Sequence, residues 1–461
     1  MTTDGLDVVV IGGGPAGYVA ALRASQLGGK VALVERENVG GTCLNRGCIP
    51  TKALISSVEV LSTVRSAARF GVKVEGVSLD FAEMQARKGR IVSQLVKGVE
   101  YLLNRAKVDV VRGSGSMLEP GAVRVVSESG STQVLRSRSV IIATGSQPSG
   151  LPSCRCDGVH TITSEQALEL TSVPTSLLVV GAGPIGMEFA TIFAELGSAV
   201  TVVEMLPQVL PGVDTEIATI AERELKKRRV KVLTGAGVQG TALRDGKVAT
   251  TLTNGQDITT DVVLVSVGRT CDCASLGVEE LRIALERGMI KANEKMETTA
   301  RGIYAAGDIV GGPLLAHKAF AEGLVAAENA MGGASVMDYR VIPRCIYTLP
   351  EIASVGHSEQ SARDAGLEMK TGSFPFRASG RAQAAGQFEG LVKLIGDARS
   401  DELLGAHIIG AHATELIGEL ALALKLGARI EDLAQTVHAH PTMSEAVMEA
   451  AHVLRGRAIH V

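Results

Sequence analysis

Close to its start the chain carries the stretch Asp7-Val8-Val9-Val10-Ile11-Gly12-Gly13-Gly14-Pro15-Ala16-Gly17. The apolar run predicts a buried strand of a parallel sheet. After it, the sequence predicts an Ala-rich helix from Tyr18 to Leu27 and a second strand, Val31 to Val34, that ends in Glu35. Strand, G-x-G-x-x-G turn, helix, strand and terminal acid together make a complete dinucleotide-binding fingerprint.

The same pattern occurs a second time. Leu177 to Val180 leads into Gly181-Ala182-Gly183-Pro184-Ile185-Gly186, then a helix from Met187 to Leu196 and a strand from Ala199 that ends in Glu204. The middle glycine and the acid are 21 positions apart in both copies. Two fingerprints with one spacing predict that the chain binds two dinucleotides.

The glycines and acids of the two fingerprints have separate roles. The glycines permit a tight turn and close approach to a pyrophosphate, and they are Gly12, Gly14, Gly17, Gly181, Gly183 and Gly186. Glu35 and Glu204 are placed to accept hydrogen bonds from a ribose. Glu204 would repel a 2′-phosphate, and Met205-Leu206 supplies no Arg to receive one, so the second site is predicted to prefer NAD over NADP.

A pair of cysteines follows the first fingerprint, in Gly40-Gly41-Thr42-Cys43-Leu44-Asn45-Arg46-Gly47-Cys48-Ile49-Pro50-Thr51-Lys52. Five helical steps advance about 7.5 Å, more than the roughly 4.4–6.8 Å between the Cα atoms of a disulphide. The stretch is therefore predicted to be a turn that enters a helix running from Ile49 to Val58. The helix N-terminus and Lys52 would favour thiolate character. The alternative, two buried cysteines that never meet, is uncommon in such a setting.

Length, charge and composition narrow the class of protein. The 461 residues suggest about three domains, and a net charge of −3 gives no indication of nucleic-acid or membrane-surface binding. Seven cysteines, an odd number, argue against a secreted disulphide framework. No signal-peptide pattern and no bilayer-spanning apolar stretch is apparent, so the sequence predicts a cytoplasmic protein.

The remaining apolar runs predict further strands. Val140 to Ser146, Asp261 to Arg269 and Gly302 to Asp308 are each expected to be a strand followed by a Gly turn. In the last third of the chain, Phe374–Phe376, Leu391–Ile395 and Leu404–Ile409 are expected to form antiparallel strands, followed by an amphipathic helix, Glu415–Leu426. Such a unit could bury its apolar stripe in a core or in a dimer surface.

Near the C-terminus the chain reads His438-Ala439-His440-Pro441-Thr442-Met443-Ser444-Glu445. A carboxylate can fix the tautomer of a histidine and make it a better base, which suggests proton transfer by His440 and Glu445. Thr442 to Glu445 also has the capping-box pattern of a helix start. On these residues alone the two interpretations stand level.

Taken together, these motifs resemble the pyridine nucleotide–disulphide oxidoreductases from end to end. Besides the fingerprints, the resemblance rests on Gly41-Thr42-Cys43 to Lys52, Ala143-Thr144-Gly145, Met187-Glu188, Ala306-Gly307-Asp308 and His440-Pro441-Thr442 to Glu445. It implies an α/β fold with two Rossmann-like dinucleotide-binding domains, for FAD and NAD, and a C-terminal α+β dimerisation domain. The boundaries expected are 1–147 for the FAD domain, 148–271 for the NAD domain, 272–340 for a central domain and 341–461 for the dimerisation domain.

The resemblance also implies the residues of each site. FAD would contact Gly12, Gly14, Gly17, Glu35, Lys52, Gly115, Thr144, Gly145, Ser146, Asp308, Leu315, Ala316 and His317. NAD would contact Gly181, Gly183, Gly186, Glu188, Glu204, Val238 and Gly268. The catalytic residues would be Cys43, Cys48, His440, Glu445, Lys52 and Glu188, and no metal is expected.

The reaction implied is the oxidation of a dithiol by NAD. His440 would deprotonate the substrate, whose thiolate attacks Cys43, while Cys48 would pass two electrons to FAD and Lys52 would sit beside the flavin, paired with Glu188. Within the family, the chain resembles most the enzymes that oxidise protein-bound dihydrolipoamide. The resemblance also implies a homodimer, and a partner protein that is a lipoyl-carrying acyltransferase or a glycine-cleavage carrier protein. Reduction of another disulphide or of mercuric ion, and a non-catalytic flavin-binding subunit, are the alternatives.

Two features depart from the common pattern of the family. Arg46 stands between the cysteines, where a small apolar residue is frequent, and could raise the redox potential of the pair by stabilising thiolates. Cys154-Arg155-Cys156 and Cys271-Asp272-Cys273 could approach each other and bind metal or cross-link, although their spacing is not that of a common zinc site.

Overall fold

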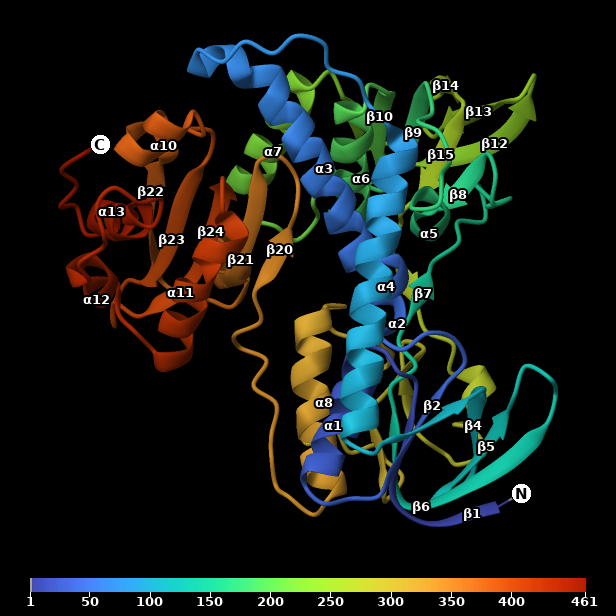
Figure 1. The fold of residues 1–461 in the computed structure, drawn as a ribbon. Coiled ribbons are helices and arrows are strands. Elements are labelled where there is room, and N and C mark those ends of the chain that lie inside the picture. The colour runs from blue at the N-terminus through green and yellow to red at the C-terminus, as the bar shows by residue number, and fades with distance from the viewer. Residues whose placement is uncertain (1) are drawn as a thin grey trace. The chain divides into compact units, whose positions relative to one another are not determined.

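A computed structural model describes residues 2–461, with side chains from Gly5 onward. The chain divides into two compact units (Figure 1). The first holds the residues up to Leu54 together with Asp80–Ser149 and Gly268–Asp338, and the second holds Ile55–Leu79, Gly150–Val267 and Tyr339–Val461. The predicted FAD-binding and central domains fall mostly in the first unit and the other two in the second, while their individual boundaries stay a prediction.

The first unit is built on a seven-stranded sheet with the order β3-β2-β1-β6-β5-β4, in which β19 also pairs with β6. Strands β1, β2, β3, β6 and β19 are parallel, with Val8 opposite both Val31 and Ser139. The strands are β1 (Thr2–Ile11), β2 (Val31–Glu35), β3 (Asp109–Arg112), β4 (Ser114–Glu119), β5 (Ala122–Val126), β6 (Thr132–Ile142) and β19 (Ile303–Ala305). Its α-helices are α1 (Pro15–Gln26), α2 (Gly41–Arg46), α4 (Phe81–Arg105) and α8 (Ala316–Ala330), joined by the start of α3 (Cys48–Ser66).

The long strand β6 explains how distant segments reach one place. Its first half pairs antiparallel with β5, and its last residues, Val140 to Ile142, pair in parallel with Ile303 to Ala305 of β19. The turn after β19, which contains Asp308, therefore lies beside the turn after β6, which contains Gly145. Short ribbons β7 (Gln147–Pro148) with β16 (Arg269–Thr270), and β17 (Leu285–Glu286) with β18 (Met289–Ile290), complete the unit.

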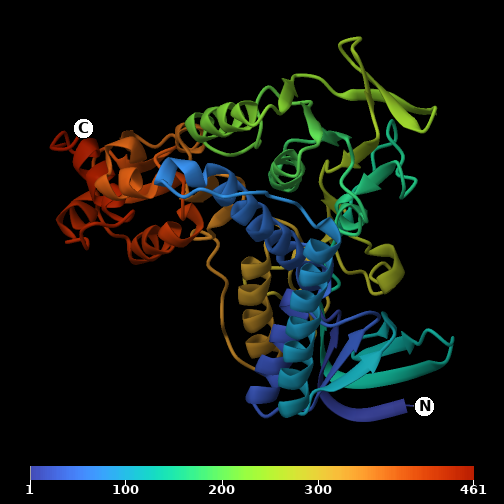
Figure 2. The same ribbon diagram turned by 45° about the horizontal axis from the view of Figure 1, so that its top comes forward.

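The second unit repeats this plan in a parallel sheet with the order β11-β10-β9-β15-β8 and an antiparallel sheet β12-β13-β14, drawn in yellow-green in Figure 2. The strands are β8 (Thr161–Thr163), β9 (Ser176–Val180), β10 (Ala199–Glu204), β11 (Lys231–Thr234), β12 (Val238–Arg244), β13 (Lys247–Leu252), β14 (Asp257–Thr260) and β15 (Val262–Val265). The helices are α5 (Ser164–Ala167), α6 (Pro184–Glu195) and α7 (Thr215–Lys227).

The last third of the chain forms a five-stranded antiparallel sheet with the order β20-β21-β24-β23-β22. The three strands predicted here are present and antiparallel, but β20 and β21, which sequence patterning did not predict, extend the sheet. The elements are β20 (Arg344–Ile346), β21 (Glu351–Gly356), α9 (Glu359–Asp364), β22 (Met369–Pro375), α10 (Gly380–Ala385), β23 (Leu391–Asp397), β24 (Leu403–Gly410), α11 (Ala413–Leu426), α12 (Ile430–Gln435) and α13 (Glu445–Leu454).

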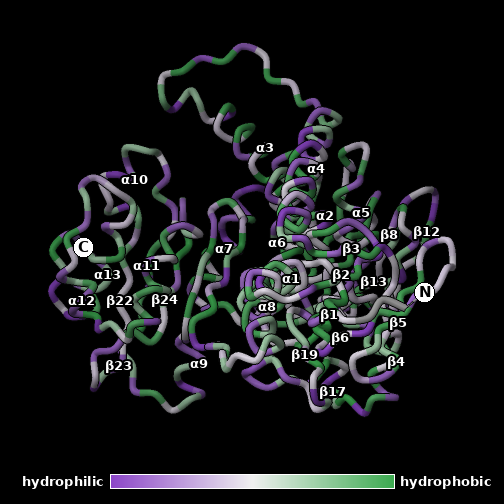
Figure 3. Tube along the Cα trace, turned by 60° about the horizontal axis from the view of Figure 1, so that its bottom comes forward, coloured by the Kyte–Doolittle hydropathy of each residue, from purple (hydrophilic) through white to green (hydrophobic). Residues whose placement is uncertain are grey.

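Aliphatic side chains fill the cores, as expected for a chain with 3% aromatic residues. The central strands β1 and β9 are buried on both faces, with Val8 to Val10 and Leu177 to Val179 all 0% exposed. Figure 3 colours each residue of the trace by its hydropathy and labels β1. No helix within residues 2–461 is both long and apolar enough to cross a bilayer.

Candidate active site

The cysteine pair lies where two helices meet. Cys43 is on the short helix α2, Gly47 breaks the helix with φ −143° and ψ −110°, and α3 begins at Cys48. The predicted turn into a helix is present, although the turn is itself helical, and α3 runs to Ser66 rather than ending at Val58. The break at Gly47 is what lets cysteines five residues apart approach each other.

The cysteine-bearing helix packs directly on the first fingerprint. The N–H of Gly40 donates to the carbonyl of Gly13 at 2.8 Å. A Cβ atom on Gly41 would lie only 2.6 Å from the Cα atom of Gly14, and Gly41 has φ +57°. Glycine is therefore needed at position 41 for this approach of backbone to backbone. The dinucleotide turn and the thiol pair therefore form one rigid arrangement within the first unit.

The surroundings of Cys43 hold its proton on the sulfur. The pKa of Cys43 is raised above its usual value, first by a hydrogen bond with the Cys48 thiol and then by burial. The charge of Lys52 acts in the opposite direction and lowers the pKa, while Asp308 raises it. The Lys52 charge therefore favours the Cys43 thiolate, against the Cys48 hydrogen bond and the burial that disfavour it.

Tyr18 is a neighbour of Cys43 that the sequence did not reveal. Burial raises the pKa of its phenol, and the charge of Cys43 adds to the effect. Its ring meets Phe320 of α8 edge to face, with 5.9 Å between the centroids. Tyr18 opens an Ala-rich helical run, so no motif distinguishes it from an ordinary core residue.

Arg46 has a partner that the sequence did not indicate, while its effect on the redox potential stays a prediction. Its guanidinium forms an ion pair with Glu37, and both side chains are partly exposed. The N–H of Glu37 in turn donates to Glu35 Oε1 at 2.8 Å. The charges that act on Cys43 include Lys52 and Asp308. Arg46 thus ties the cysteine helix to the end of β2.

The acids of the two fingerprints have the same backbone partners. Glu35 Oε2 accepts from the N–H of Gly13 at 2.7 Å, and Glu204 Oε2 accepts from the N–H of Ala182 at 2.8 Å. The second oxygen of each acid accepts from the residue two positions on, Glu37 or Leu206. Each carboxylate therefore holds its own glycine turn as well as standing where a ribose would lie.

The glycines of each fingerprint divide into two kinds. A Cβ atom on Gly17 would lie 1.7 Å from the carbonyl oxygen of Gly12, and one on Gly186 would lie 2.0 Å from that of Gly181. By contrast, a Cβ atom on Gly14 would meet nothing closer than 3.8 Å, and Gly14 has an ordinary φ of −71°. Gly183 likewise has open space, with φ −72°. The protein itself does not require glycine at these two middle positions, which fits a bound pyrophosphate lying against them.

Asp308 lies in a polar cluster at the carboxyl ends of β6 and β19. Its Oδ2 accepts from the Ser146 hydroxyl at 2.5 Å, and that hydroxyl accepts from Arg269 Nε at 2.7 Å. The Cys271 thiol donates to the backbone carbonyl of Asp308 at 3.3 Å, and burial raises the pKa of Cys271 to about 11. Arg269 and Cys271 were not expected to take part, because no local pattern links them to Asp308.

The other predicted FAD residues lie in the first unit. Thr144 and Gly145 follow β6 next to the Gly12 turn, since a Cβ atom on Gly12 would lie 3.0 Å from Thr144 Cα. Gly115 is on β4, where a Cβ atom would meet Ile11 and Val34. Leu315, Ala316 and His317 form the start of α8. Their contacts with FAD stay a prediction.

The predicted NAD residues are divided between the units. Gly181, Gly183, Gly186, Glu188 and Glu204 surround the turn between β9 and α6, and Val238 begins β12 in the same unit. Gly268, with φ +132°, belongs to the first unit. Glu188 is buried on α6 and accepts from the N–H of Tyr347 at 3.0 Å. Its pairing with Lys52 stays a prediction, since the two residues belong to different units.

His440 and Glu445 are in contact, and Glu445 also binds the backbone just before α13, while proton transfer by the pair stays a prediction. His440 Nδ1 lies 2.9 Å from Glu445 Oε1, while Glu445 Oε2 accepts from the N–H of Thr442 at 2.7 Å. Burial raises the pKa of Glu445, but the Thr442 N–H and His440 outweigh it and the pKa is lowered overall. The His440 side chain is 80% exposed, so its other ring nitrogen is accessible.

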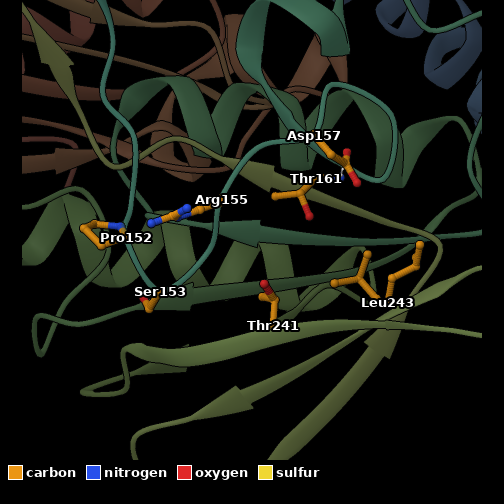
Figure 4. Close-up of a pocket in the computed structure, with 8 residues that line it drawn as sticks. Pro152, Ser153, Arg155, Asp157, Thr161, Thr241 and Leu243 are labelled. Atoms are coloured by element: carbon orange, nitrogen blue, oxygen red, sulfur yellow. Dashed lines mark hydrogen bonds between the residues drawn. The ribbon is translucent and has the colours of Figure 1, made fainter.

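The two C-x-C pairs belong to different units of the chain. Cys154 packs in the core around β9 and β15 of the second unit, and Cys273 in the core of the first. Among residues 2–461 no group of three or more His, Cys, Asp and Glu side chains is arranged to hold a metal ion. A shallow pocket of about 340 Å³ lies near Arg155, Asp157, Thr161 and Thr241 (Figure 4), and its lining includes none of the predicted site residues.

The fold and this site define a flavin-type disulphide oxidoreductase, and comparison with known proteins agrees. Residues 6–323 match the model of the pyridine nucleotide-disulphide oxidoreductases, and residues 342–451 match the dimerisation domain of the same proteins. The chain belongs to the pyridine nucleotide–disulphide oxidoreductase family. The dimerisation domain supports a homodimer.

Named relatives within the family are similar over their full length. The chain is 43% identical to the dihydrolipoyl dehydrogenase of Bacillus subtilis, covering 98% of this chain and 99% of the relative. It is 41% identical to the mitochondrial dihydrolipoyl dehydrogenase of Pisum sativum, covering 100% and 93%. The crystal structure of LpdA from Mycobacterium tuberculosis matches with a TM-score of 0.91 at 30% identity, covering 96% and 99%.

Enzymes of this kind use FAD and NAD. The residues present fit both groups. Each fingerprint leaves open space at its middle glycine, Gly14 or Gly183, and closes its turn with an acid at the end of the second strand. The thiol pair belongs to the fingerprint that comes first in the chain, which is where a flavin has to lie if it is to exchange electrons with Cys48.

Proposed function

We propose that this chain is a dihydrolipoyl dehydrogenase, which oxidises protein-bound dihydrolipoamide to lipoamide and reduces NAD. The observation that carries the proposal is the packing of α2, the helix that bears Cys43, against Gly13 and Gly14 of the first fingerprint, with Cys48 in contact with Cys43. FAD bound there would accept an electron pair from the thiols and pass it to NAD as hydride. Gly12, Gly14, Gly17, Glu35 and Asp308 would hold the FAD.

The His440 and Glu445 pair would begin the reaction. With Nδ1 held by Glu445 Oε1 at 2.9 Å, the ring presents Nε2 as the proton acceptor. The carboxylate fixes this tautomer and stabilises the charge that the ring gains when it takes a proton from the substrate thiol. The Thr442 N–H bond keeps the carboxylate in place.

The thiol chemistry balances in two exchange steps. The substrate thiolate attacks Cys43 of the oxidised pair, forming a mixed disulphide and releasing Cys48 as a thiolate. The second substrate thiol, deprotonated in turn, displaces Cys43 and closes the lipoamide disulphide. One substrate dithiol is thereby oxidised and one enzyme disulphide reduced, and the Lys52 cation stabilises the thiolates that result.

Purified protein with bound flavin should reduce NAD when given dihydrolipoamide. NADP, glutathione and mercuric ion serve as parallel controls. Cys43→Ser should abolish turnover, and His440→Ala should lower kcat about 10²- to 10⁴-fold, the usual loss for a general base. If NADH reduces the flavin but dihydrolipoamide gives no turnover, the cofactor assignments stand and the substrate is another disulphide.

We also propose that the physiological substrate is carried by a separate protein, a lipoyl-bearing acyltransferase or glycine-cleavage carrier. The exposed His440 ring supports this, because a lipoyl arm on a carrier has to reach it from outside. A carrier domain that bears a reduced dihydrolipoyl group should therefore be oxidised at a substantially lower KM than free dihydrolipoamide. Equal KM values for the two would count against a dedicated carrier.

A further inference from the structure

Two charged side chains are buried in the first unit and take no part in the thiol chemistry. Lys318 and Glu322 lie one turn apart on α8 and are 1% and 0% exposed. Lys318 Nζ is 3.0 Å from Glu322 Oε1. A buried ion pair is costly unless further hydrogen bonds compensate for the lost water. The hydrogen bonds that compensate for the burial of Lys318 and Glu322 therefore show which part of the chain the pair holds in place.

Both residues bind the backbone at the ends of one loop. Lys318 Nζ donates to the carbonyl of Gly311 at 2.8 Å and to that of Gly307 at 3.4 Å. Glu322 Oε2 accepts from the N–H of Gly307 at 2.8 Å. Gly307 and Gly311 have φ values of +86° and +78°, so the backbone turns sharply at both points. The three residues between them are Asp308, Ile309 and Val310.

The loop presents Asp308 toward the first fingerprint. Its carboxylate is fixed by Ser146, which follows β6, and a Cβ atom on Gly307 would lie 3.1 Å from Cβ of Ala16 in α1. The Ser146 bond restrains the side chain, while Lys318 and Glu322 restrain the main chain on either side of it. Without the ammonium, the Gly311 carbonyl would lose a buried partner and the loop would be free to shift.

We propose that Lys318 and Glu322 are positioning residues that hold Asp308 where it can bind the ribityl chain of FAD. The inference rests on the proposed function only in assigning FAD to the first fingerprint. The pair acts through Asp308, so its effect appears in flavin affinity rather than in the thiol exchange. The alternative role is general stabilisation of α8, which would leave flavin affinity unchanged.

The test measures the dissociation constant of FAD for reconstituted apoprotein, by quenching of flavin fluorescence, together with the melting temperature. K318M should weaken FAD binding at least tenfold. If Lys318 acts through Asp308, the loss should shrink to less than twofold when K318M is made in a D308A background, because neighbouring residues that share one role are not additive. A full tenfold loss in that background would overturn the proposal.

A matched control separates positioning from stability. Lys393 is also buried, at 3% side-chain exposure, and lies 2.9 Å from Asp214 in the second unit. K393M should lower the melting temperature and change FAD affinity less than twofold. Should K318M fold poorly, K318M/E322M removes both charges, an exchange that is often close to neutral for stability. FAD affinity equal to that of the parent in K318M and in K318M/E322M would overturn the proposal. A parent protein that binds no FAD would instead overturn the cofactor assignment itself.

Discussion

Two cations near the thiol pair in the sequence have different partners in space. Lys52 lowers the pKa of Cys43, and its charge therefore favours the thiolate. Arg46 is closer in sequence but forms an ion pair with Glu37 at the end of β2. Nearness in the sequence therefore does not decide which cation lowers the pKa of a thiol. The guanidinium of Arg46 lies against Glu37, which follows β2.

The redox potential should therefore respond to Lys52 and not to Arg46. Arg46→Val should shift the two-electron potential of the thiol pair by less than about 15 mV, whereas Lys52→Met should lower it by more than about 30 mV, since about 30 mV corresponds to 1.4 kcal/mol. Equilibration with NAD/NADH mixtures measures both. A shift for Arg46→Val as large as that for Lys52→Met would restore the hypothesis made from the sequence.

At the scale of elements, the sequence was most informative where a motif has a fixed geometry. The two fingerprints predicted β1, β2, β9 and β10 and both acids, because strand, turn and helix follow one another locally. Strands β20 and β21 were missed, since their pairing depends on residues far along the chain. Arg269 and Cys271 were missed for the same reason, because they lie far from Asp308 and Ser146 in the sequence and meet them only in the folded chain.

The middle glycines give a test at the level of one element. Gly14→Ala should change the free energy of unfolding by less than about 1 kcal/mol, because its φ suits alanine and the space is open. It should nevertheless weaken FAD binding at least tenfold, since the methyl group occupies the cofactor's place. Chemical denaturation and flavin titration measure the two effects. Gly17→Ala is the contrast, because its Cβ atom would meet the Gly12 carbonyl and the protein itself should be destabilised.

Strand β24 carries a buried histidine that should make stability depend on pH. His407 donates from Nε2 to the carbonyl of His357 at 2.8 Å. Burial lowers the pKa of His407 and the charge of Lys393 adds to this, whereas the bond to His357 and the charges of Asp214 and Glu359 oppose it without reversing it. The folded state therefore binds fewer protons than the unfolded state below the unfolded pKa of about 6.5. Stability should fall as pH drops from 7.5 to 5.5, by at most about 1.4 kcal/mol per pH unit.

Urea denaturation at several pH values measures this slope. His407→Gln keeps a donor for the His357 carbonyl and removes the titrating group, so its slope should be flatter over the same range. A slope identical to that of the parent would assign the pH dependence to other groups. His357→Gln is a suitable control, since it leaves in place both the His407 ring and the backbone carbonyl that this ring binds.

At the scale of the whole molecule, the proposed machinery is divided between two compact units. Cys43 and Cys48 belong to the first, and His440 with Glu445 to the second, in the dimerisation domain. The sequence predicted each group separately from its motif. It could not show that Glu445 serves both His440 and the Thr442 backbone, because that depends on how the chain turns before α13.

If each active site combines the cysteines of one subunit with His440 of the partner subunit, two inactive variants should complement each other. Co-expressed Cys43→Ser and His440→Ala chains would form mixed dimers in which one of the two sites is intact. The purified mixed dimer should then have about half of the parent turnover number, and the unfractionated product of random pairing about a quarter. Activity assays of both samples measure this. No recovery in a verified mixed dimer would place both groups of each site on the same chain.

Glu204 stands where a ribose would lie and also binds two backbone amides, which limits how the coenzyme preference of this protein can be redesigned. Replacing the acid with a small residue and adding an arginine is the obvious route to a phosphorylated coenzyme, but Glu204 also holds the backbone of Ala182 and Leu206. The exchange would leave two amide groups without their acceptor and loosen the turn that it is meant to retarget. A successful redesign must supply a new acceptor for those amides before it alters the charge.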